Sequence, residues 1–519
     1  MKLTDVSLVS LVAVVARTQK TEPSFCCSAL ETSGLGDRLL YAHDDNFQKQ
    51  TGSYFSAKAR YAAQCIFQPR TAAEVALAVK TLVAANQTKP CPFAIRGNGH
   101  TTNPDYANIR DGVTMDLAKM NSTTYHASNQ TASVLPGATW GMVYAALDPL
   151  HVMVAGGRSF SVGVSGLVIG GGNSFFSPQV GMVCDGVAQF EVVLASGAIV
   201  YASRDQNADL FQALKGGTSN FGVVTRLDLY AFPNTDLWGG LVSYPNSTAA
   251  QQFSSLAAWP ARLQTDPRAT VIVFCSYASL TDTTVFVNSY EYTQPVARPP
   301  IFDNFLALPG NTSDTTRVTN MTSLVFELEQ PEHYRIRYYT LTFVNDERIL
   351  AKTNDLFNDM VQDIKAEVDG DYKLQYLFQP LPRLYTDKGL EKGGNILGLD
   401  RTEDDLVSVA LLYISWVGEE HDELFESRAI QMKDDLHAYA ASVGGDNEYI
   451  YLDYADETQD PLGSYGAANV AKMRAVARKY DPTGVFQHMV PGGFKISKVT
   501  KYAGNEVHGD GMKHAKDEL

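Results

Sequence analysis

Residues 92–100 constrain the fold more than any other part of the chain. They read Pro-Phe-Ala-Ile-Arg-Gly-Asn-Gly-His, an apolar run that suits a buried strand and that stops at a glycine-bracketed turn. Gly97 and Gly99 free the backbone for positive φ, and such a turn directs its N–H groups inward as a nest for an anion such as a diphosphate. The segment therefore predicts a strand that ends at an anion-binding loop, with His100 close to whatever the anion carries.

Two further glycine-rich segments follow. Residues 156–173 are rich in glycine and almost free of charge, which is too apolar for a flexible linker and is typical of backbone packed closely against a flat ligand. Residues 213–225 combine a Gly-Gly pair with Asn-Phe-Gly-Val-Val-Thr and lead into a strand. Three such segments together favour a bound ligand over an incidental tight turn.

Several common catalytic motifs are absent. The dinucleotide fingerprint G-x-G-x-x-G fails because Thr102 stands where the third glycine belongs. No glycine is followed at P-loop spacing by Gly-Lys-Ser/Thr, and the hydrolase elbow G-x-S-x-G fails at Leu167. These absences remove most of the support for a Rossmann site, for phosphoryl transfer and for serine hydrolysis.

The order of five motifs resembles that of the berberine-bridge-enzyme-like FAD oxidases, which have the fold of vanillyl-alcohol oxidase and p-cresol methylhydroxylase. The resemblance runs from about residue 27 to about residue 495. It rests on residues 96–100 (Arg-Gly-Asn-Gly-His), 162–172, 220–225, 451–454 (Tyr-Leu-Asp-Tyr) and 480–486. It implies an α+β fold with a two-part FAD-binding domain of the p-cresol methylhydroxylase type and a substrate domain with an antiparallel sheet backed by helices.

The resemblance also implies which residues contact the cofactor. His100 matches the histidine that many members join covalently to the flavin, so FAD attached through His100 alone is expected. The other residues expected to bind the cofactor are Arg96, Gly97, Asn98, Gly99, Thr101, Ser159, Gly163, Gly166, Gly170, Gly222, Val223, Tyr451 and Asp453.

Two positions distinguish this chain within the family. Ser159 stands where members with a second, cysteinyl link carry cysteine, so that link is excluded. Val162 matches the position that gates oxygen in relatives, and its small side chain favours O2 as electron acceptor, with hydrogen peroxide as product.

The catalytic residues implied by the resemblance are Tyr451, Asp453 and Val162. Tyr451 matches a tyrosine that helps to deprotonate substrate hydroxyls, although a phenol works as a base only when its neighbours tune it. Asp453 replaces the asparagine of the family motif, and its pKa is expected to rise if the site is dry. Which of Tyr449, Tyr451 and Tyr454 faces the flavin stays open, and each could instead pack a core.

Composition favours a large enzyme over a binder of polyanions. The net charge of −15 leaves no electrostatic basis for nucleic-acid binding, and 519 residues exceed one hydrophobic core. The predicted organisation is a signal peptide over 1–16, an FAD-binding domain over 55–235, a substrate domain over 236–460, a return to the FAD-binding domain over 461–500 and a retrieval signal over 516–519. We expect a monomer without a membrane span or metal site, with a small-molecule substrate and O2 as partners.

The two ends of the chain suggest its compartment. Residues 1–16 carry one early lysine and then an apolar run of about ten residues that ends at small residues, as secretory leaders do. The chain ends Lys-Asp-Glu-Leu, an endoplasmic-reticulum retrieval signal, and six Asn-x-Ser/Thr sequons support export. An enzyme of the endoplasmic-reticulum lumen is therefore expected, with secretion as the alternative.

Six cysteines suit an oxidising compartment. The family usually ties its N-terminal cysteine to a later one, but the pairing among Cys26, Cys27, Cys65 and Cys91 stays open. Cys184 and Cys275 lie in apolar surroundings and are expected to be buried free thiols.

Residue patterning predicts the main elements. Helices are expected at 72–85, 347–367 and 467–479, and strands at 191–194, 271–277, 284–292, 335–343, 372–378 and 406–414. Polar residues on these strands could face a substrate, but alternation sends about half of them to the other side of the sheet. They are Arg335, Arg337, Gln375, Tyr376 and Gln379.

Three functions remain open at this point. The first is an FAD-dependent oxidase that removes hydride from an activated C–H of a small specialised metabolite, with or without oxidative cyclisation. The second is an oligosaccharide oxidase acting at the C1 hydroxyl. The third is a flavin-holding pericyclase with little net redox chemistry.

Overall fold

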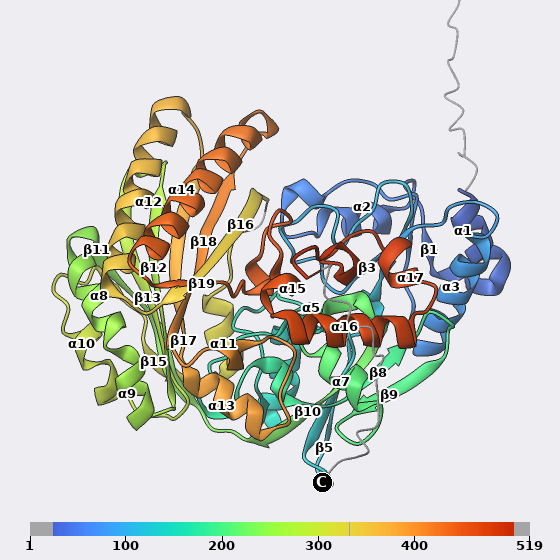
Figure 1. The fold of residues 1–519 in the computed structure, drawn as a ribbon, viewed down its shortest axis with the longest axis horizontal. Coiled ribbons are helices and arrows are strands. Elements are labelled where there is room, and N and C mark those ends of the chain that lie inside the picture. The colour runs from blue at the N-terminus through green and yellow to red at the C-terminus, as the bar shows by residue number, and fades with distance from the viewer. Residues whose placement is uncertain (1–23, 332, 503–519) are drawn as a thin grey trace, which may run out of the picture.

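The computed structural model describes residues 24–331 and 333–502. The predicted signal peptide and the C-terminal retrieval signal lie outside these residues. The described chain forms two bodies around three sheets, one body built from the first two sheets and the other from the third (Figure 1).

The first sheet ends at the predicted anion-binding loop, residues 97–101. Its strands have the order β1-β2-β4-β3, and β3 lies parallel to β4. Helix α3 (Ala72–Ala85), capped by Thr71 and apolar along one side, shares a core with this sheet. The strands are β1 (Leu39–Leu40), β2 (Cys65–Phe67), β3 (Phe93–Arg96) and β4 (Val113–Asp116).

The second sheet completes the predicted FAD-binding part. Its order is β5-β6-β10-β8-β9, and β7 pairs with the end of β10. The strands are β5 (Thr123–His126), β6 (Thr131–Val134), β7 (Val152–Val154), β8 (Val187–Val193), β9 (Ile199–Ser203) and β10 (Val223–Pro233). Helix α16 (Ala467–Tyr480) returns late in the chain and contacts α7 (Ala208–Leu214) of this part.

The third sheet has nine antiparallel strands and lies on the left in Figure 1. They are β11 (Leu237–Pro245), β12 (Ala269–Ala278), β13 (Thr283–Tyr292), β14 (Ser313–Asp314), β15 (Arg317–Thr319), β16 (Arg335–Val344), β17 (Tyr372–Leu381), β18 (Leu406–Trp416) and β19 (Asp446–Asn447). Helices α8 (Ala249–Ala257), α12 (Glu347–Glu367) and α14 (Asp422–Ser442) cover one face. The predicted α+β class and the strands expected between residues 271 and 414 are confirmed.

Alternation along β12 and β17 assigns the two faces of this sheet. Tyr376 donates its hydroxyl hydrogen bond to Asn354 of α12 at 2.9 Å, so its side chain points toward the helices. The next residues along the strand, Gln375 and Leu377, point the other way and line a cavity, as does Phe274 of β12. The sheet therefore serves as the roof of that cavity.

Two disulfides tie the N-terminal helix α1 (Phe25–Leu30) to the first sheet. They join Cys26 to Cys91 and Cys27 to Cys65, which gives the pairing that the sequence left open. Cys184 and Cys275 are free and buried, as expected.

Shorter helices connect these parts. Those near the cavity are α2 (Asp45–Gly52), α4 (Trp140–Leu147), α5 (Val164–Gly170), α6 (Ser177–Val180), α11 (Met321–Glu327) and α13 (Arg383–Glu391). The remaining ones are α9 (Trp259–Thr265), α10 (Asp303–Leu306), α15 (Pro461–Ser464) and α17 (Val485–His488). Among the described residues, none of the helices is long and apolar enough to cross a membrane.

Candidate active site

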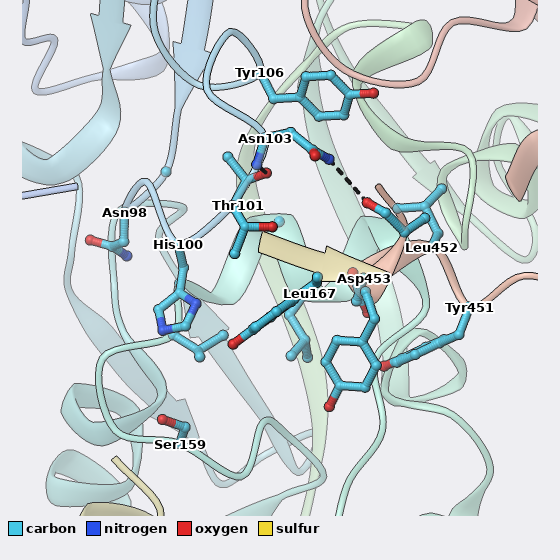
Figure 2. Close-up of a pocket in the computed structure, with 18 of the residues that line it drawn as sticks. Asn98, His100, Thr101, Asn103, Tyr106, Ser159, Leu167, Tyr451, Leu452 and Asp453 are labelled. Carbon is cyan, nitrogen blue, oxygen red and sulfur yellow. Dashed lines mark hydrogen bonds between the residues drawn. The ribbon is translucent and has the colours of Figure 1, made fainter. Parts of the chain in front are cut away.

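A cavity of about 380 Å³ lies where the nine-stranded sheet meets the FAD-binding part (Figure 2). Eleven of the sequence-predicted residues line it: Gly97, Asn98, Gly99, His100, Thr101, Ser159, Val162, Gly163, Gly166, Tyr451 and Asp453. The fold thus brings together loops that are up to about 350 residues apart in the chain. Arg96, Gly170, Gly222 and Val223 do not line it.

The loop after β3 needs both of its glycines. Gly99 has φ of +72°, and a Cβ there would lie 2.7 Å from the ring of Tyr54. A Cβ at Gly97 would lie 2.7 Å from Ser165 Oγ. Asn98 holds the loop in place because its Nδ2 donates to the carbonyl oxygens of Gly137 and Ala138, at 3.2 and 3.0 Å.

Arg96 supports this loop from behind. Its guanidinium donates to Gln50 O at 2.8 Å and to Ser53 Oγ at 2.7 Å, and it stacks on the Tyr54 ring at 3.8 Å. Only 3% of the residue is exposed, and it does not line the cavity. The contacts of Arg96 in the structure are thus with the chain that supports the loop, and its expected contact with the cofactor stays a prediction.

His100 lines the cavity as a neutral imidazole. Its ring stacks on Phe55 with 4.0 Å between centroids, and burial lowers the pKa of His100 to about 4. Within the described part of the chain, its Nε2 has no hydrogen-bond partner.

The glycine-rich stretch packs directly against this loop. A Cβ at Gly163 would lie 2.9 Å from Asn98 Nδ2, whereas a Cβ at Gly166 would meet no protein atom within 4 Å. Gly166 therefore borders open space, as backbone against a flat ligand would. Gly170 lies beneath Asp453, because a Cβ there would approach Asp453 Oδ1 to 2.0 Å.

Gly222 and Val223 lie away from the cavity. A Cβ at Gly222 would meet Val192 at 2.5 Å, and Val223 is buried in the core under α3. This glycine is required by close strand packing between β10 and β8.

Ser159 and Val162 line the edge of the cavity next to a carboxylate that the sequence did not single out. Glu329 accepts hydrogen bonds from Ser159 Oγ at 3.1 Å and from the Ser161 backbone N–H at 2.9 Å. The charge of Glu329 acts to raise the pKa of His100, but burial, which lowers that pKa, has the larger effect. Glu329 follows α11 in an irregular segment, where no periodicity marks a functional residue.

Tyr451 and Asp453 lie together at the floor of the cavity. Burial raises the pKa of the Tyr451 phenol well above its ordinary value, and the neighbouring Asp453 acts in the same direction. Asp453 accepts a hydrogen bond from the Gly172 N–H at 3.0 Å, and burial raises its pKa to about 7. The expected rise in the pKa of Asp453 is found, whereas the raised pKa of Tyr451 keeps its phenol protonated, and the catalytic roles expected for both residues stay predictions.

Tyr454 differs from Tyr451 in that two side chains donate hydrogen bonds to its hydroxyl oxygen. Its hydroxyl oxygen accepts hydrogen bonds from Arg158 Nη2 at 3.2 Å and from Gln379 Nε2 at 2.9 Å. A guanidinium and an amide therefore both donate to one phenol oxygen. All three residues line the cavity, and sequence analysis left Tyr454 only as one of three alternatives.

The rest of the wall is largely apolar and aromatic. Tyr338 lies against Tyr413 and Tyr454, with ring centroids 5.5 and 5.9 Å apart. The sheet contributes Ile272, Phe274 and Leu377 beside Gln375 and Gln379. Of the other polar strand residues, Arg335 pairs with Asp422, and Arg337 pairs with Asp456 at 2.8 Å.

Asn103 links the anion-binding loop to the tyrosine segment. Its Nδ2 donates to Ala455 O at 3.0 Å (Figure 2). Its Oδ1 accepts from the Glu457 N–H at 3.1 Å. Arg337 Nη1 donates to the same Oδ1 at 3.4 Å. The loop and the catalytic floor are thus held as one unit.

The residues fit a flavin dinucleotide. The cavity offers a glycine loop without room for side chains, an open backbone at Gly166 and an unpartnered histidine nitrogen. No group of His, Cys, Asp and Glu suited to a metal occurs in residues 24–331 and 333–502.

Comparison with known proteins supports this interpretation. A family model described as an FAD binding domain matches residues 63–203. The chain is 41% identical over 476 residues to the FAD-dependent monooxygenase drtC of Aspergillus calidoustus, covering 91% of this chain and 90% of that protein. It is also 41% identical to the FAD-dependent monooxygenase sdcF of Emericella nidulans, covering 92% and 99%.

A solved structure shares the fold. A variant of berberine bridge enzyme superposes with a TM-score of 0.68 at 14% identity, covering 91% of this chain and 99% of that one.

Proposed function

The chain belongs to the berberine-bridge-enzyme-like family of FAD-linked oxidoreductases, and from that premise we propose that it oxidises a small, largely apolar specialised metabolite. The reaction is removal of hydride from a carbon that bears, or is conjugated to, an acidic hydroxyl, with O2 as final acceptor and H2O2 as product. The observation that carries this proposal is the Tyr454 hydroxyl, which accepts two hydrogen bonds inside the largely apolar cavity that His100 also lines.

The chain supplies the binding surface and the proton acceptor. Residues 97–101 and the backbone at Gly163 and Gly166 would hold FAD, which when bound supplies the two-electron acceptor. The step needs Tyr454 as the phenolate: its Oη, to which Arg158 donates a hydrogen bond, takes the hydroxyl proton of the substrate while hydride leaves the neighbouring carbon. Val162, at the cavity edge, leaves room for O2.

The cavity wall favours an apolar, conjugated substrate over a sugar. Tyr338, Tyr413, Phe274 and Leu377 present rings and aliphatic groups, and the polar groups cluster around Arg158. An oligosaccharide carries a hydroxyl on nearly every carbon, and such a wall would leave most of them without partners. The names of the relatives raise one competing reaction, monooxygenation.

An oxygen-isotope experiment tests the reaction type. The purified enzyme is incubated under ¹⁸O2 with cinnamyl alcohol, 4-hydroxybenzyl alcohol and cellobiose, and products and peroxide are measured. We expect labelled H2O2 and an unlabelled aldehyde from an aromatic alcohol. Label in the organic product would establish monooxygenation instead, and turnover of cellobiose alone would establish the sugar oxidase.

We also propose that FAD is attached through His100. The neutral ring and the unpartnered Nε2 support this, because bond formation to carbon needs a free lone pair on nitrogen. In acid-precipitated wild-type protein the yellow colour should stay in the pellet, and in His100→Ala it should leave with the supernatant. Colour retained in the His100→Ala pellet would contradict the attachment site, and Ser159→Ala provides the matched control.

A further inference from the structure

A second cavity lies beside the first and contains an unpaired cation. It has a volume of about 680 Å³ and is lined mainly by residues 105–111, 457–462 and 491–500. Tyr106, Gly493 and Phe494 line both cavities, and the rings of Tyr106 and Phe494 meet edge to face at 5.1 Å. The two cavities are thus separated by one layer of residues.

Lys495 is the unusual member of this second wall. Only 2% of the residue is exposed, and its Nζ has no hydrogen-bond partner in the part of the chain that the structure describes. A Cβ on Gly493 would lie 4.0 Å from that Nζ, so the ammonium group sits under the segment that both cavities share. A buried ammonium without a partner is costly, which points to an anion supplied from outside the chain.

The neighbouring acids do not supply that anion. Glu457 accepts from Arg337 at 2.9 Å, Asp460 caps α15 by accepting from the Gly463 N–H at 2.8 Å, and Asp111 is exposed. Asp481 acts on Lys495 through its charge, but its two oxygens accept the N–H groups of Val485 and Phe486, at 2.8 and 2.7 Å. The remaining acid, Asp105, accepts the Tyr61 hydroxyl.

We propose that Lys495 binds a phosphate group in this second cavity. A phosphate oxygen suits a lone ammonium donor, and the exposed Lys498 and Arg110 add positive charge to the same wall. Two sources share this chemistry: the diphosphate of FAD reaching past Tyr106 and Phe494, or a separate phosphorylated ligand. Burial lowers the pKa of Lys495 to about 7 in the absence of the anion, so phosphate binding should strengthen below that pH.

The test compares holoenzymes of the wild type, Lys495→Met, Lys495→Arg and the matched control Lys498→Met. FAD per protein is measured by absorbance after denaturation, and inorganic pyrophosphate is titrated into each holoenzyme by calorimetry. Substrate oxidation is not a readout, so a failure of the proposed reaction would leave this result unaffected.

Each of the two possible sources of the phosphate group predicts a different result. If the phosphate belongs to FAD, Lys495→Met should lose more than half of its flavin, Lys495→Arg and Lys498→Met should keep theirs, and pyrophosphate should not bind. If it belongs to another ligand, flavin content should stay equal, and pyrophosphate should bind wild type at least tenfold more tightly than Lys495→Met.

Two outcomes would overturn the proposal. One is equal flavin content together with equal or absent pyrophosphate binding in all four proteins. The other is an equal loss of flavin in Lys495→Met and Lys495→Arg without pyrophosphate binding, which would assign Lys495 to packing.

Discussion

Two tyrosines three residues apart show how strongly the surroundings decide the role of a residue. Tyr451 is buried beside the Asp453 carboxyl, which opposes loss of its proton, whereas Tyr454 receives hydrogen bonds from Arg158 and Gln379. Sequence could not separate them, because both lie in a short irregular segment without strand or helix periodicity. The distinction depends on Gln379, 75 residues away from Tyr454 along the chain.

Replacing each tyrosine by phenylalanine should separate their roles. With a substrate found in the isotope experiment, we expect Tyr454→Phe to slow flavin reduction by roughly 10²–10⁴-fold, the loss typical of an acid–base group. Tyr451→Phe should cost far less, because its hydroxyl is poorly suited to accept a proton. Stopped-flow absorbance measures both, and a larger loss in Tyr451→Phe would reverse the assignment.

The raised pKa of Asp453 predicts that the stability of the protein depends on pH. Its pKa is about 7 in the folded protein, whereas an unfolded aspartate ionises near pH 3.8. Between these values the folded state holds the extra proton, so the carboxyl lowers wild-type stability progressively as pH rises from about 4 to about 7. Asp453→Asn should therefore have a higher melting temperature than wild type at about pH 7.5, and the same melting temperature as wild type at about pH 4.5.

The control for this experiment is Asp369→Asn, because Asp369 is exposed. Scanning calorimetry of the holoenzymes gives the difference in melting temperature between each of the two variants and wild type at each pH. A gain of the same size at both pH values would mean that Asp453 acts through packing and not through its proton.

Among the elements, the regular ones were predictable and the irregular ones were not. Helices α3 and α12 match the expected 72–85 and 347–367, because each combines an apolar stripe with a capping Thr71 or Asp346. The glycine-rich α5 and the short edge strands β14 and β15 carry no such pattern and were not predicted. Glu329 and Arg158 were missed as site residues for the same reason.

The N-terminal disulfides should stabilise the strand that carries the anion-binding loop. Cys27–Cys65 closes 38 residues and Cys26–Cys91 closes 65, and the second bond ends just before β3. Cys27→Ser combined with Cys65→Ser should lower the free energy of unfolding by about 2–4 kcal/mol, measured by urea denaturation. A reductant should then destabilise wild type more than the double variant, and equal urea midpoints would contradict a stabilising role.

At the scale of the whole molecule, we propose a glycosylated enzyme of the endoplasmic-reticulum lumen. The leader-like N-terminus, the terminal Lys-Asp-Glu-Leu and the six sequons support this. Four sequon asparagines, Asn121, Asn129, Asn311 and Asn320, are exposed and belong to the described surface. The two disulfides suit the same oxidising compartment.

Removing residues 516–519 should move the protein from the cell to the medium, because the retrieval receptor would no longer bind it. Immunoblots of cell and medium fractions measure the shift, and enzymatic deglycosylation should lower the apparent mass in both. Peptide mapping should find glycans at the exposed Asn121, Asn129, Asn311 and Asn320. A truncated protein that stays inside the cell would contradict retrieval.

The hydrogen bond from Asn103 to Ala455 joins residues 352 positions apart and also fixes the order in which the site can be assembled. At ribosomal rates of 5–20 residues per second, the loop waits about 20–70 s before the segment that completes it has been synthesised. Until then the glycine loop of the nascent chain lacks residues 451–455, which it contacts in the folded protein. Enclosure of the flavin is therefore a late, nearly post-translational event, and a nascent chain stalled before residue 451 could not complete it.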